Sequence, residues 1–84
     1  MMKKTLYEAL KEREKELLEK LEEVRCRKYA LREALNQGVI ANERMRELAW
    51  ERLEALHAEE VRLEDELDEV WQLMSEIEKK QEVK

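Results

Sequence analysis

The sequence predicts an all-α fold, a two-helix antiparallel coiled-coil hairpin. Its 84 residues contain one glycine, Gly38, and no proline, so a long helical pattern is interrupted once. On both sides of Gly38, apolar residues recur with the alternating three- and four-residue spacing of a heptad. Charged residues make up 46% of the chain and aromatic residues 5%, as in long helices. We therefore expect one domain over residues 1–84, with helices at about 5–37 and 42–81 and a turn at about 38–41.

The first helix is expected to begin after Thr5. Thr5 and Glu8 have the spacing of a capping box, in which the hydroxyl oxygen and the carboxylate each accept a bond from the other residue's backbone N–H. Further along, alternating a and d positions form a seam. The seam consists of Tyr7, Leu10, Glu14, Leu17, Leu21, Val24, Lys28, Leu31 and Leu35.

Gly38 is the expected C′ residue of this helix, because glycine adopts positive φ without a Cβ penalty. Asn42 is the expected N-cap of the second helix, and Glu43 places a carboxylate in its first turn. The second seam alternates in the same way. It consists of Asn42, Arg46, Ala49, Leu53, Leu56, Glu60, Leu63, Leu67, Val70, Met74 and Ile77.

The register of the two helices is predicted from these seams. An antiparallel pair aligns residues whose numbers add up to a constant, and 77 brings every a position to a d position, as for Leu10 with Leu67. This alignment predicts four ion pairs on the flanks: Arg13–Glu66, Lys20–Glu59, Lys11–Glu64 and Arg32–Glu43. It also sets Arg25 beside Trp50 and Lys4 beside Trp71 for cation–π contacts, and it brings one like-charged pair, Arg27–Arg52, together.

Four seam positions are charged, with Glu14 and Glu60 toward the open end and Lys28 and Arg46 toward the tip. Two interpretations remain open. The long side chains can bend past the seam to water. Alternatively, two hairpins pack antiparallel, so that the acidic layers of one meet the basic layers of the other in a homodimeric four-helix bundle.

The charge is unevenly distributed. Between Arg25 and Arg52, seven basic and four acidic residues give +3, whereas ten basic and eighteen acidic residues elsewhere give −8. The hairpin is therefore expected to have a basic tip and an acidic open end. The net charge of −5 argues against general nucleic-acid binding.

Length and composition also bound the class of protein. The chain is too short for an active-site cavity inside a large core. The single cysteine, Cys26, excludes an internal disulfide and suits a reducing compartment. No apolar run approaches the roughly 20 residues that span a bilayer, and no signal-peptide pattern opens the chain. We expect a cytoplasmic protein without a membrane partner.

One motif has the spacing of a metal-ligand pair. Glu54 and His57 match the Glu-x-x-His pattern of di-iron bundles. Glu54, however, occupies an outer b position and His57 a flank, so neither faces the core. We expect no metal ligand, no cofactor and no catalytic residue, and hence no enzyme.

The turn and its surroundings suggest a docking point for a protein partner. If Val39 makes the hydrophobic contact that accompanies a glycine cap, Ile40 has little left to pack against. The predicted partner-binding residues are Val39, Ile40, Arg32, Arg44, Met45 and Leu48. Trp50 and Trp71 share a stripe of the second helix, where they either cover the hairpin's own seam or anchor a partner.

The segment from Ala34 to Glu43 resembles the tip of the N-terminal coiled-coil hairpin in Gre-type transcript-cleavage factors, which reach into the secondary channel of RNA polymerase. That family has a glycine followed by tip acids. Here Val39 and Asn42 stand where the acids are expected, with Glu43 next to the second position. The resemblance implies channel docking and carries no cleavage chemistry.

The expected function is that of a non-enzymatic coiled-coil protein–protein interaction module, acting by self-association, by docking of the hairpin tip, or by both. The alternatives are contact of the basic tip with RNA or with the RNA polymerase channel, and an engineered helical hairpin without a natural function.

Overall fold

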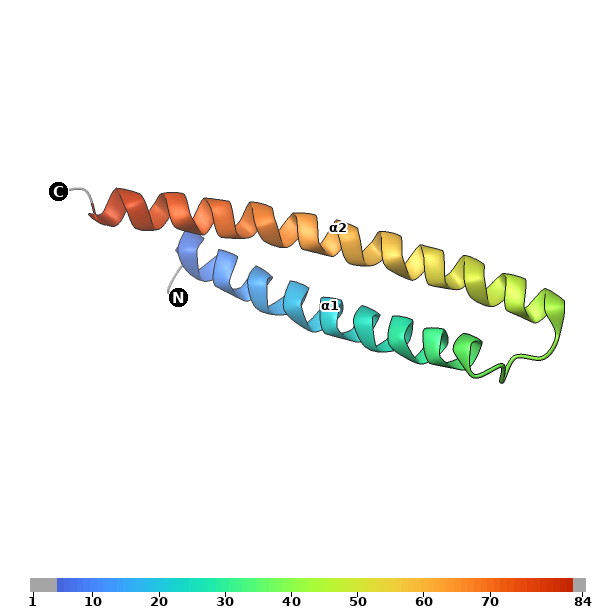
Figure 1. Ribbon diagram of the computed structural model, residues 1–84. Helices are drawn as coiled ribbons and strands as arrows, with labels where there is room; N and C mark the ends of the chain where they lie inside the picture. The colour runs from blue at the N-terminus through green and yellow to red at the C-terminus, as the bar shows by residue number, and fades with distance from the viewer. Residues whose placement is uncertain (1–4, 83–84) are drawn as a thin grey trace.

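A computed structural model describes residues 5–82. The chain forms two helices, α1 (Leu6–Asn36) and α2 (Glu43–Glu82), which run antiparallel and side by side (Figure 1). The molecule is a rod of 64 × 28 × 16 Å. The described residues contain no strand, so the predicted all-α helical hairpin is confirmed.

Side chains cap the N-terminus of each helix, although of the predicted capping box only the bond to Thr5 is present among the described residues, without the reciprocal bond from the Thr5 N–H to the Glu8 carboxylate. The Thr5 Oγ1 atom accepts a hydrogen bond from the N–H of Glu8 at 3.1 Å. Asn42 Oδ1 accepts bonds from the N–H groups of Arg44 at 2.9 Å and Met45 at 3.2 Å. These bonds satisfy backbone donors that have no partner in the first turn of a helix. Both helix starts are thus encoded locally.

Gly38 ends α1 through a Schellman motif. Its φ of 68° lies in the left-handed region. The Gly38 N–H donates to the carbonyl of Leu35 at 3.3 Å, and the Val39 N–H donates to the carbonyl of Ala34 at 3.2 Å. This pair of bonds is the one that defines the motif. The predicted role of Gly38 as the C′ residue is confirmed.

The core lies along the seam of the half of the rod that is remote from the turn. Leu17 and Leu67 are its most buried members, with 0% and 2% of their surface exposed. The cluster comprises Leu10, Leu17, Leu21, Val24, Leu56, Leu63, Leu67, Val70 and Met74. Toward the turn, Ala49 is buried, but the other seam residues Lys28, Leu31, Leu35 and Leu53 are only half-buried. The hairpin is therefore well packed at its open end and loosely packed near its tip.

The predicted register is wrong by one heptad. In the pairs Tyr7–Glu78, Glu14–Trp71 and Lys28–His57, which are in contact across the helices, the residue numbers add up to 85. The predicted alignment would have set Lys28 about 16 Å along the rod from Glu60, at 1.5 Å per residue, yet their side chains are 2.8 Å apart. Only sums that differ from 77 by a multiple of seven bring every a position to a d position, and 84 is the one nearest to these contacts. The seam therefore aligns residues whose numbers add up to 84, as for Leu17 with Leu67.

This shift changes the shape of the tip. In the observed register the end of α1 at Asn36 lies level with Leu48, so the first turn of α2 extends beyond α1. Figure 1 shows the connecting segment reaching out to that overhanging turn. At the opposite end, α2 extends past the start of α1. No helix in residues 5–82 is long and apolar enough to cross a membrane.

Candidate interaction surface

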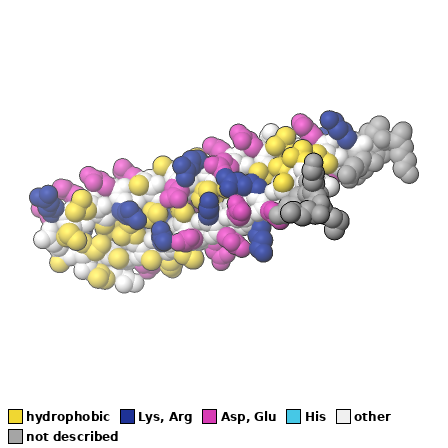
Figure 2. Space-filling view, turned by 180° about the vertical axis from the view of Figure 1, so that it is seen from behind, with side chains coloured by type: hydrophobic (Ala, Val, Ile, Leu, Met, Phe, Trp, Pro, Cys, Tyr) yellow, Lys and Arg dark blue, Asp and Glu magenta, His cyan; other side chains and the backbone are white. Residues whose placement is uncertain are grey.

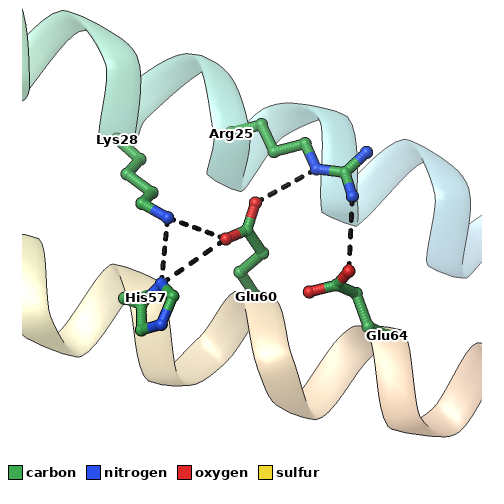
Figure 3. A network of polar contacts seen from close by, with 5 residues as sticks. All are labelled: Arg25, Lys28, His57, Glu60 and Glu64. Carbon is green, nitrogen blue, oxygen red and sulfur yellow. Dashed lines mark hydrogen bonds and ion pairs between the residues drawn. The ribbon is translucent and has the colours of Figure 1, made fainter.

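Two of the four charged seam residues, Lys28 and Glu60, belong to a network of polar contacts within one chain (Figure 3). Glu60 lies at its centre with 13% of its side chain exposed. Its carboxylate accepts hydrogen bonds from Lys28 Nζ at 2.8 Å and from Arg25 Nε at 3.1 Å. An acid in an apolar seam is tolerated here because two cations replace the water that it loses.

Two further side chains extend the network toward solvent. Arg25 also pairs with Glu64 at 3.6 Å. The Nδ1 atom of His57 lies 2.9 Å from Lys28 Nζ and 3.6 Å from Glu60. A neutral imidazole fits this place, because its Nδ1 can then accept a bond from the ammonium group. Within residues 5–82, no cluster of three or more His, Cys, Asp or Glu side chains could hold a metal ion.

The network lowers the pKa of Glu60. The hydrogen bond from Lys28 is the largest cause, and the bond from Arg25 and the charges of both cations add to it. Loss of water around the carboxylate acts in the opposite direction and is outweighed. Glu60 is therefore held in its charged form by its neighbours.

The carboxylate of Glu14 has a different hydrogen-bond donor, which is not a cation. The indole Nε1 of Trp71 donates to its carboxylate at 2.6 Å. One layer further out, the Tyr7 hydroxyl donates to Glu78 at 2.8 Å, and this bond is the main reason why the pKa of Tyr7 is raised. Trp71 and Tyr7 thus use their polar ends on the seam of their own hairpin.

Arg46, the fourth charged seam residue, lies on the overhanging turn of α2, where its guanidinium donates to the Ala41 carbonyl at 3.4 Å. All four charged seam positions are thus accommodated in a single hairpin. In the dimeric alternative, Lys28 and Glu60 would have found their partners on a second molecule, but in this hairpin they bind each other. The charged seam therefore gives no reason for an antiparallel dimer.

The flanks agree with the sequence prediction in part. Arg13 pairs with Glu66 at 2.8 Å, as predicted. The other three predicted pairs are absent from the ion pairs of the described residues, and Arg25 binds Glu60 and Glu64 instead of stacking on Trp50. Lys4 lies outside the described residues. The Lys11 ammonium lies 5.8 Å from the centre of the Tyr7 ring, a cation–π contact that was not predicted.

The predicted partner-binding residues lie around the tip. Val39 is 69% exposed and Leu48 50% exposed, and Met45 is also exposed. Ile40 was expected to have little to pack against, but it is half-buried, and Val39 is the more exposed of the two. Arg32 and Arg44 are exposed and form no ion pair with a described residue.

Sequence reasoning missed Arg25, His57 and Trp71 as partners of the charged seam. A signal was available, because an alignment shifted by one heptad brings Lys28 and Glu60 into neighbouring layers. Trp50 remains more than half-exposed, and no described hydrogen bond or cation–π contact involves it.

No family of known proteins, no curated protein and no solved structure matches this chain.

Proposed function

We propose that the chain is a protein–protein interaction module that docks through its hairpin tip. The observation that carries this proposal is the exposure of Met45 and Leu48 on the first turns of α2, at and beyond the end of α1, together with Val39 in the connection. Apolar side chains that lack an internal partner gain most when another protein covers them.

The charges around these side chains indicate the kind of partner. Arg32 and Arg44 have no carboxylate partner in the described part of the chain, so they are available to acidic groups. A protein surface with an apolar pocket and carboxylates at its rim fits this tip. No catalytic role is proposed, because the motifs and the grooves of the described residues support none.

Competition cross-linking tests the proposal. The chain, with a photo-reactive residue in place of Val39, is irradiated with a cell extract. Excess unlabelled wild-type chain is expected to suppress the cross-linked product, whereas Leu48→Asp suppresses it roughly tenfold less well, the loss expected of an interface anchor. Val61→Asp, an exposed apolar position away from the tip, is the matched control and competes like the wild type.

Equal competition by Leu48→Asp and the wild type would contradict tip docking. A cross-linked product that ribonuclease removes, and that weakens steeply with salt, would instead indicate the RNA contact considered from the sequence. In that case Arg32→Glu combined with Arg44→Glu abolishes the product, and Leu48→Asp does not.

A further inference from the structure

One face of the rod carries two rows of opposite charge. A groove along this face is lined by Arg13, Lys20 and Arg27 of α1 and by Glu59, Arg62 and Glu66 of α2. The flank positions of α1, seven residues apart, are all basic here, and those of α2 at Glu59 and Glu66 are acidic. We call this surface the flank face.

The flank face becomes apolar at both ends. Toward the tip, the groove continues past Arg27 between Ala30, Leu31 and Ala34 of α1 and Leu56 of α2, with Arg52 at its edge. Toward the open end, the same heptad positions are held by the exposed Leu6 and Leu73. On the face of the rod that Figure 2 shows, hydrophobic side chains gather near the tip and again near the other end, with charged side chains between them.

The hairpin leaves part of this charge pattern unused. Arg13 is paired with Glu66 and Arg27 with Glu23. Lys20 and Glu59 line the same groove, yet neither forms an ion pair with a described residue. Opposite charges on the two rows therefore remain available to another molecule.

The exposed area also favours association. The chain exposes 7206 Å², whereas a compact monomer of 10.2 kDa exposes about 5,300 Å². The excess of about 1,900 Å² is larger than the roughly 800 Å² that each partner contributes to a standard interface.

We propose that a second copy of this chain covers the flank face, with the two tips at the same end. A two-fold axis along the rod places α1 of each copy on α2 of the other, in antiparallel contact. At equal height, Arg27 then meets Glu59 of the second copy, Lys20 meets Glu66, and Glu23 meets Arg62. Toward the tip, Ala30 of each copy lies level with Leu56 of the other, and a four-helix bundle results.

The opposite orientation, with tip against open end, is disfavoured by the same rows. It places α1 on α1 of the second copy, so that Arg13, Lys20 and Arg27 face one another, and it places the acidic row of α2 on itself. In the proposed arrangement, Arg52 lies level with Ala34 and meets no like charge there. This inference is independent of tip docking to a different protein, because Val39 and the overhanging turn stay outside the charged groove.

Sedimentation of the full-length chain tests the assembly. The wild type is expected to sediment as a dimer at micromolar concentration. Lys20→Glu and Glu66→Lys are each expected to raise the dissociation constant about tenfold, because the two symmetric Lys20–Glu66 pairs between the copies become repulsive. Mixing the two variants is expected to restore dimers, since each supplies the charge that the other lacks. Lys15→Glu, the same change outside the groove, is the matched control.

If the exchanged charges paired only within their own chain, mixing the two variants would not restore dimers, because each chain would keep its own pair of like charges. Absence of rescue, or a wild type that stays monomeric up to about 1 mM, overturns the proposal but leaves tip docking intact. The orientation is tested with a spin label at Val39→Cys in a Cys26→Ser background. Labels within about 30 Å of each other support tips together, since adjacent helices pack 8–10 Å apart; a separation near the 64 Å rod length overturns it.

Discussion

At the scale of single residues, Glu60 shows how a coiled-coil seam tolerates an acid. An isolated carboxylate there would lose hydration without compensation. Lys28 and Arg25 supply charge-assisted hydrogen bonds to both of its oxygens, so the cost is largely offset. The interaction is modest in size, because Arg25 is about half-exposed and solvent screens its share.

This balance predicts a pH-dependent effect of Glu60→Gln. The folded-state pKa of Glu60 lies below its unfolded value, so its contribution to stability is fully present above the unfolded pKa and is lost as the pH falls through the folded pKa. At pH 7 we expect Glu60→Gln to lower the free energy of unfolding by about 1 kcal/mol. Toward pH 3 the difference from the wild type should shrink, because the wild-type carboxylate becomes protonated. Urea denaturation at both pH values measures this.

Glu64→Gln is the control for that experiment. Glu64 has 49% of its side chain exposed and makes only the longer contact with Arg25. Its replacement should change the free energy of unfolding by less than about 0.5 kcal/mol at either pH. A deficit of Glu60→Gln that stays constant with pH would show that the charge of Glu60 is not the cause.

At the scale of the elements, Gly38 is the position where backbone conformation matters most. A Cβ at Gly38 would meet no atom within 4 Å, so a substitution there causes no clash, and its cost comes from the positive φ alone. We expect Gly38→Ala to lower the free energy of unfolding by about 1 kcal/mol. Gly38→Asn should cost less, because asparagine tolerates the left-handed region. Thermal denaturation followed by circular dichroism ranks the stabilities of the wild type and the two variants. A Gly38→Ala chain as stable as the wild type would contradict the left-handed conformation of Gly38.

The caps and seams could be predicted from the sequence because each depends on local spacing. Thr5, Gly38 and Asn42 act on backbone groups within a few residues of themselves. The register could not be fixed in the same way, because a slip of one heptad still brings every a position to a d position. The charged layers decide between the two alignments. The observed one joins Leu17 to Leu67 and lets Lys28 reach Glu60, whereas the predicted one would have set Leu17 against Glu60.

At the scale of the whole molecule, the one-heptad slip makes the two ends of the rod unequal. It carries Arg46 and Met45 beyond the end of α1, which exposes the tip surface that the sequence had placed around a tighter turn. The candidate residues were predictable as a group, because they follow from the position of Gly38. Their individual exposure was not, because the backbone path of the connection decides whether Val39 or Ile40 turns inward.

The unequal packing predicts a gradient of amide hydrogen exchange along the rod. The buried cluster from Leu10 to Val24 and from Leu56 to Met74 should exchange slowest, and the half-buried seam around Leu31 and Leu53 should exchange faster. At nanomolar concentration we expect protection near the tip to be at least about tenfold lower than in the cluster, because local opening there exposes less apolar surface. Exchange followed by mass spectrometry of peptides measures this. Uniform protection of both halves at high dilution would contradict a loosely packed tip, whereas protection around Ala30 and Ala34 that rises with concentration is the pattern expected when a second copy covers the flank face.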